Sequence, residues 1–287
     1  QLLFLDTNYL GKWDLGFTLP LEHNLNMKKQ IHILKLFIQD NLAKEMEYRI
    51  NFLFWILVEG IYVLLHIYII DIMYKFTNSI FGWNKAEMLF LVGIFRVIEG
   101  VFHIIFHPNI LKIPQRVNKG ELDMYLTKPI NPLFMISTRY HSWDETSTVI
   151  TGAVLVIYSL SILGLLNIYS ILLSIVVCIL GEVALFSLML ALASWSFFIE
   201  RMTAIKSIWE VTSRAIRNPI EIYSRNRLIL DILFIPFSLV ATWPAQIVLG
   251  KISIWMLPLE MAFVVLLGYS AYRFWLYALG HYSSASS

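Results

Sequence analysis

The chain has 287 residues, of which 58% are hydrophobic and 15% charged, and its formal net charge is +2. Soluble domains carry about 25% charged residues, so too few polar side chains remain here to cover the apolar surface. The composition excludes an ordinary soluble domain and predicts that lipid is the solvent for most of the chain. The single cysteine, Cys178, excludes an intrachain disulfide and a cysteine-based zinc cluster.

The N-terminal region divides into two parts. Residues 1–26 lack the basic start and apolar run of a signal peptide, and we expect an N-terminal extension followed by one domain at 27–287. Residues 28–49 carry apolar side chains at three- and four-residue spacing: Ile31, Leu34, Ile38, Leu42 and Met46. This spacing predicts an amphipathic helix in the cytoplasmic membrane interface. The alternative is a helix that packs on the bundle.

Six apolar runs are long enough to cross a bilayer, which takes roughly 20 residues. They cover about 50–73, 88–106, 148–165, 168–198, 228–249 and 254–279. The last two contain Pro236, Pro244 and Pro258, and each proline favours a kink or a break. The sequence therefore predicts an all-α polytopic membrane protein of six spans, with a broken or re-entrant element between the fifth and the sixth.

The basic residues give the expected orientation. With the N-terminus in the cytoplasm, seventeen Lys and Arg lie in inner segments and three, Lys75, Lys85 and Lys251, in outer loops. Cytoplasmic loops carry such an excess. We therefore expect a multi-pass membrane protein with both termini and residues 107–147 on the cytoplasmic side.

The second span carries a polar stripe of Arg96, Glu99, His103 and His107, whose spacing places them on one helix face. One interpretation is a metal site built from Glu99, His103 and His107. The other is a polar stripe facing the bundle interior, with Arg96 paired to Glu99 or to Glu59 and His66 of the first span. Intramembrane charges are costly and normally face a neighbour or a watery path. Glu182 and Glu260 are further candidates for the interior.

Residues 116–134, RVNKGELDMYLTKPINPLF, are charged and punctuated by prolines between apolar runs. Gly120 permits a tight turn after a helix, and Glu121 and Asp123 favour the start of another. Pro129 and Pro132 impose extended backbone on the residues before them. The pattern predicts a rigid cytoplasmic elbow, a name we keep for residues 116–134. The alternative is a solvated loop.

The elbow resembles a motif of the ABC-2 type transporter permeases of bacteria. The matching residues are Lys119-Gly120-Glu121-Leu122-Asp123, then Leu126, Lys128-Pro129 and Asn131-Pro132-Leu133-Phe134. Three further segments are similar to elements of the family: Asn218–Tyr223, Ile235-Pro236-Phe237 with Trp243-Pro244-Ala245, and Tyr282–Ser286. Asn218 and Glu221 depart from the family pattern.

The resemblance implies a six-helix permease of the bacterial cytoplasmic membrane. It would pair with a second permease, identical or related, and bind ABC ATPase subunits. The elbow and the N-terminal helix would contact the ATPase. No G-x-x-x-x-G-K-[ST] loop is present, so ATP and Mg would be held by the partner and no cofactor by this chain. We expect lipid around the chain, no nucleic-acid partner, and export rather than import. A metal-dependent membrane enzyme and a non-transporting scaffold are the alternatives.

Overall fold

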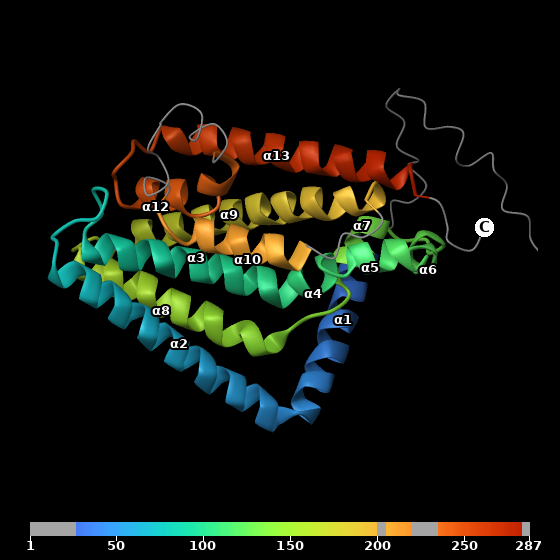
Figure 1. Ribbon diagram of the computed structural model, residues 1–287, viewed down its shortest axis with the longest axis horizontal. Coiled ribbons are helices and arrows are strands. Elements are labelled where there is room, and N and C mark those ends of the chain that lie inside the picture. Colours follow the sequence, from blue (N-terminus) through green and yellow to red (C-terminus); the bar gives the residue numbers. More distant parts are fainter. Residues whose placement is uncertain (1–26, 200–204, 220–234, 283–287) are drawn as a thin grey trace, which may run out of the picture.

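The computed structural model describes residues 27–199, 205–219 and 235–282, and these residues form helices joined by turns (Figure 1). The N-terminal extension predicted at 1–26 lies outside the described residues. Five helical segments are long and apolar enough to cross a membrane: Arg49–Lys75, Lys85–Ile105, Trp143–Ile162, Ile168–Phe197 and Met256–Leu279. The described residues contain no strand, only an isolated bridge between Ile80 and Trp83. The prediction of an all-α polytopic membrane protein is confirmed.

The spanning helices follow the predicted apolar runs closely. They are α2 (Arg49–Lys75), α3 (Lys85–Ile105), α8 (Thr146–Ile162) after the 3-10 turn η3 (Trp143–Glu145), α9 (Ile168–Ser194) before η4 (Trp195–Phe197), and α13 (Met256–Leu279). Asn84 caps α3 with a capping box to Glu87, and the Asn167 side chain accepts from the backbone N–H of Ser170 at the start of α9. These caps satisfy helix-end N–H groups that would otherwise lack partners.

The region of the fifth predicted span, 228–249, is described only from residue 235. There the chain forms a short helical turn, then α12 (Thr242–Val248), which is too short to cross a membrane. The expectation of a broken element is met in this part of the chain, which contains Pro236 and Pro244. Pro258 was expected to kink or break the last span, but it lies in the first turn of α13, where the missing N–H costs no hydrogen bond.

Helix α3 forms the centre of the bundle and contacts α2, α8, α9 and α12. Its backbone lies against that of α8 through three glycines. A Cβ on Gly152 would lie 2.8 Å from the backbone N of Val97, and one on Gly93 would lie 2.9 Å from that of Val156. Small residues at helix interfaces permit this close approach in membranes. Gly100 completes the set, with its Cβ position 2.9 Å from the backbone N of Val149.

Short helices cap one end of the bundle: α4 (His107–Ile110), α5 (Ile113–Asn118), α6 (Asp123–Leu126) and α7 (Pro132–Thr138). Helix α1 (Met27–Glu47) also reaches this end, and α13 finishes there (Figure 1). The predicted helix at 28–49 is present. Its Phe37 packs on the core and its Asn41 is buried, while Ile31, Leu42 and Met46 are exposed. Its place in the membrane interface stays a prediction.

Helix α10 (Ile205–Ile216) belongs to a segment that was expected to be cytoplasmic, 200–227. In the structure this helix packs alongside α3 (Figure 1). Trp209 is buried and packs 5.2 Å from Phe102, between ring centroids, whereas Lys206, Glu210 and Arg214 are exposed. The apolar face of α10 packs on the bundle and its charged face is exposed, as expected for an amphipathic helix. Residues 200–204 and 220–234 lie outside the described residues.

Candidate functional site

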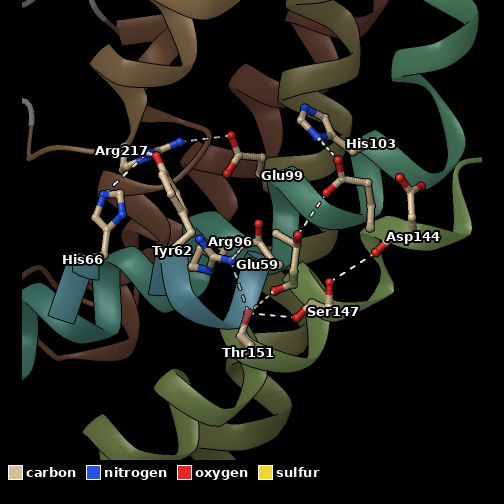
Figure 2. Close-up of polar contacts among 12 residues, drawn as sticks. Glu59, Tyr62, His66, Arg96, Glu99, His103, Asp144, Ser147, Thr151 and Arg217 are labelled. Carbon is tan, nitrogen blue, oxygen red and sulfur yellow. Dashed lines mark hydrogen bonds and ion pairs between the residues drawn. The ribbon is translucent and has the colours of Figure 1, made fainter. Parts of the chain in front are cut away.

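Polar side chains from α2, α3, α8 and the end of α10 meet inside the bundle (Figure 2). We call this group the polar cluster. It comprises Glu59, Tyr62 and His66 of α2, Arg96, Glu99 and His103 of α3, Glu145 with Thr148 and Thr151 at the start of α8, and Arg217. Five of the intramembrane polar residues named from the sequence belong to it, namely Glu59, His66, Arg96, Glu99 and His103, whereas Glu182 and Glu260 do not.

Arg96 forms an ion pair with Glu59 across the α2–α3 interface, as one interpretation of the sequence predicted. Its Nη2 also donates to the Thr151 hydroxyl at 3.3 Å. The Arg96 side chain is only 3% exposed. An isolated charge at this depth would be expensive, so the pairing explains how an arginine is tolerated in the central helix.

Glu99 takes Arg217 as its partner, with Arg217 Nη2 3.3 Å from Glu99 Oε1. The predicted alternative, an ion pair between Arg96 and Glu99 within α3, is wrong. Arg96 pairs with Glu59 of α2, and Glu99 pairs with Arg217, which follows α10. Arg217 also donates to the Tyr62 hydroxyl at 2.8 Å and lies 3.5 Å from His66 Nε2. His66 thus contacts Arg217 and not Arg96, and Arg217 joins α2 to α3.

Sequence reasoning missed Arg217, and it also missed Tyr62, Glu145, Thr148 and Thr151. Positive charge between two spans was counted as cytoplasmic, which hid an arginine that reaches Glu99. A usable signal was present in residues 205–216, where apolar and charged side chains alternate with helical period. Such a helix needs an apolar surface to pack on, and the bundle supplies it.

His103 contacts Glu145, with His103 Nδ1 3.3 Å from Glu145 Oε1. The Thr148 hydroxyl donates to the other oxygen of Glu145 at 3.0 Å. His107 packs beside His103, with ring centroids 4.3 Å apart, and both rings lie against Trp209. This part of the polar cluster connects the middle of α3 to the capped end of the bundle.

The arrangement does not build the metal site that Glu99, His103 and His107 could have formed. Glu99 pairs with Arg217 and His103 with Glu145, so the three side chains serve different partners. Within residues 27–199, 205–219 and 235–282, no group of three or more His, Cys, Asp or Glu side chains is placed to hold a metal ion. The alternative of a metal-dependent enzyme therefore gains no support from the described residues.

The elbow has the local structure that its sequence predicts. Gly120 has φ +70° and follows α5, and the Glu121 N–H bonds back to the Arg116 carbonyl at 2.9 Å. This is the Schellman arrangement that ends a helix at glycine. Asp123 begins α6, which ends at Leu126, before Pro129. Asn131 caps α7 through a bond from the Phe134 N–H at 3.2 Å, with Pro132 at the first helical position.

A buried arginine holds the elbow together. Arg116 is 4% exposed and lies over the rings of Tyr125 and Tyr140, 4.9 and 5.8 Å from their centroids. Arg139 lies over the same two rings at 6.0 and 5.6 Å. Cation–π contacts of desolvated arginines are worth about 2 kcal/mol each. The elbow is therefore a packed unit, which contradicts the alternative of a plain solvated loop.

The elbow residues predicted to contact the ATPase differ in how far they are buried. Leu122 is fully buried and belongs to the core of the elbow, and Gly120 and Asn131 shape its turns. Lys119 and Pro129 are exposed, and Glu121, Asp123, Lys128 and Pro132 are half-buried. Burial raises the pKa of the Tyr282 phenol to about 12, and the nearby Asp123 carboxylate adds to the rise. Asp123 thus faces the end of α13 as well as the surface.

Comparison with known proteins identifies the family. Residues 60–286 match the family described as ABC-2 family transporter protein. A search of curated proteins found no match to the chain, and neither did a search of solved structures. The match covers most of the sequence and includes the elbow, the polar cluster except Glu59, and all spanning helices from within α2 onward. The chain is therefore an integral membrane protein that belongs to the ABC-2 family of transporter proteins.

Proposed function

We propose that this chain is the permease subunit of an ATP-driven exporter, powered by a separate ABC ATPase that docks on the elbow. The observation that carries the proposal is the elbow itself, a packed and charged unit at one end of the bundle in a member of a transporter family. A stiff element can transmit a push from a partner, whereas a solvated loop would absorb it.

The distribution of charge supports a cytoplasmic location for the elbow. At the opposite end of the bundle each of the three lysines has an acidic partner. Lys75 and Lys85 lie 3.7 and 2.5 Å from Asp71, and Lys251 lies 2.8 Å from Glu87. Lys112 and Lys119 at the elbow end are exposed. Excess positive charge marks the cytoplasmic side, so the ATPase, ATP and Mg would be found there.

The coupling path would run from the elbow into the polar cluster. Asn109 lies in α4, just before the elbow, and its side chain bonds the Tyr140 backbone at 2.7 and 3.0 Å. Asn41 of α1 donates to the Arg139 carbonyl at 2.9 Å. Arg139 and Tyr140, which lie between the elbow and α8, are thus tied to α1 and α4, and α8 begins next to Glu145. ATP-driven movement of the ATPase would shift these elements relative to α2 and α3. A second permease, identical or related, would pair with this chain and move in the same way.

Charge reversal at Glu121 tests the docking. Glu121→Lys should weaken co-purification of the chain with the ATPase subunit of its transporter and lower permease-stimulated ATP hydrolysis, because the change replaces a half-buried acid on the docking surface. The matched control is Glu210→Lys, a charge reversal on the exposed face of α10. Equal complex formation by the wild type and by Glu121→Lys, at equal melting temperature, would remove the elbow as the docking surface.

A further inference from the structure

A groove with a volume of about 490 Å³ lies between α3, α8 and α9, away from the polar cluster. Its deep walls are buried: Ile94 and Ile98 of α3 and Val156 of α8. Its rim is exposed, with Ile157, Ile175 and Ile179 each at least 50% accessible. The rim belongs to apolar spanning helices, so the groove opens toward the bilayer. The volume lies within the range of small-molecule sites, roughly 300–1,000 Å³.

Three side chains of α9 add polarity to this apolar groove. Ser174, Cys178 and Glu182 follow one another at four-residue intervals, which places them on one face of the helix, and all three line the groove. The Ser174 hydroxyl is satisfied by the Ser170 carbonyl at 2.7 Å. Glu182 is different, because both of its carboxyl oxygens are buried and neither has a hydrogen-bond partner among the described residues.

The missing partner distinguishes Glu182 from the acids of the polar cluster. Glu59, Glu99 and Glu145 each contact a basic side chain. Burying a carboxyl group without a hydrogen bond costs several kcal/mol in apolar surroundings. An unpaired, buried carboxyl group in a groove of ligand size indicates that a bound ligand supplies the missing hydrogen-bond donor.

We propose that the groove binds a hydrophobic amine that enters from the bilayer, with Glu182 as the partner of its ammonium group. The apolar walls would hold the hydrocarbon part. An ammonium offers three donors and a charge opposite to that of a carboxylate, and such bonds are roughly twice as strong as neutral ones. The lining residues include no Lys, Arg or His, so an anionic head group would find no counter-charge. This inference concerns the chain alone and does not depend on the ATPase or on the direction of transport.

Native mass spectrometry of the purified chain can test the inference with three probes of equal chain length: dodecylamine, dodecanol and dodecanoate. Dodecylamine should bind about tenfold more tightly than dodecanol, which corresponds to 1.4 kcal/mol, and dodecanoate should bind most weakly. Glu182→Gln should remove the preference for the amine. The matched control is Glu260→Gln, because Glu260 is another buried carboxyl without a hydrogen-bond partner but does not line the groove.

A second variant tests whether the amine binds in the groove. Ala153 lines the groove from α8, so Ala153→Phe should fill the space and abolish binding of the amine and the alcohol together. Cys178, the single cysteine of the sequence, gives an independent readout. Dodecylamine should slow alkylation of Cys178 by N-ethylmaleimide in lipid nanodiscs, and it should not do so in Glu182→Gln.

Three outcomes would overturn the inference in variants that retain the wild-type melting temperature. The first is equal affinity for all three probes. The second is undiminished amine binding in Ala153→Phe, which would place the amine elsewhere. The third is alkylation of Cys178 at the same rate with and without dodecylamine, which would place the bound amine away from the groove. Unchanged ATPase binding by Glu121→Lys, which would contradict the proposed docking on the elbow, would leave these results untouched.

Discussion

Several buried polar side chains take partners from segments distant in the sequence. Asn109 is fully buried and bonds the Ile105 carbonyl at 2.8 Å and the Tyr140 backbone on both its N–H and C=O sides. Arg96, Glu99 and Arg217 follow the same rule across helices. At the scale of a residue, each such contact fixes one segment against another, because leaving a buried polar group unsatisfied costs about 1–3 kcal/mol.

The Glu99–Arg217 pair can be tested by removing each partner. Glu99→Gln should destabilise the protein by about 1–3 kcal/mol, because it leaves the half-buried arginine without its counter-charge. The double variant Glu99→Gln/Arg217→Gln should recover part of this loss, since neither charge is then left alone. Thermal unfolding in detergent provides the measurement. Additive losses in the double variant would show that the two residues do not act as a pair.

His107 should make stability depend on pH. Burial lowers its pKa to about 3, and the neighbouring His103 and Lys206 add to the effect while Glu145 opposes it. In the unfolded chain a histidine binds its proton near pH 6.5. Between these values the unfolded state binds more protons, so stability falls as the pH falls from about 6.5 toward 3.

His107→Gln should reduce this pH dependence. The variant should lose less stability than the wild type between pH 7 and pH 5, by on the order of 1–2 kcal/mol. Melting temperatures at the two pH values provide the measurement, and His281→Gln, at an exposed histidine, is the control. An unchanged pH dependence in His107→Gln would contradict the assignment.

At the scale of elements, the contact between α3 and α8 depends on the absence of side chains. The backbones come so close at Gly93, Gly100 and Gly152 that a Cβ would overlap the facing helix. Arg96 and Thr151 lie in the same interface, so the position of the polar cluster follows from this packing. The elbow depends on a different device, the stacking of Arg116 and Arg139 on two tyrosine rings.

Gly152→Ala should separate the two helices and destabilise the protein by about 1–3 kcal/mol, the cost of overpacking a core. The matched control is Gly60→Ala in α2, where a Cβ would have no neighbour within 4 Å. That change should be neutral or stabilising by up to about 1 kcal/mol, because alanine favours the helix. The unfolding temperatures of the two variants measure this difference. Equal stability of both variants would contradict the close packing of α3 and α8.

At the scale of the whole molecule, the elbow, the end of α13 and part of α1 gather at one end, and the loops with Lys75, Lys85 and Lys251 lie at the other (Figure 1). The proposed function requires the first end to be cytoplasmic. Five helical segments can span a membrane by length and composition, but these properties do not choose a direction. The direction rests on the basic residues.

Single-cysteine labelling tests this orientation. In a Cys178→Ser background, Lys119→Cys should react with a membrane-impermeant maleimide in inverted vesicles but not in intact cells, and Ser79→Cys should show the reverse. Both positions are exposed, so access depends on the side of the membrane alone. Labelling of Lys119→Cys in intact cells would place the elbow outside and end the proposed coupling to an ATPase.

The sequence by itself determined the local features, because they depend on neighbouring residues. Apolar runs of sufficient length predicted the five helical segments that can span a membrane, although a sixth run, 228–249, contains only short helices where it is described. Gly120 and the prolines predicted the turns of the elbow, and helical spacing predicted that Arg96, Glu99 and His103 share a face. Partner choice depends on distant segments, so only the tertiary structure decided that Glu99 pairs with Arg217 and that α10 lies along α3. It alone also placed Glu182 in a groove, because three helices must meet to form the groove walls.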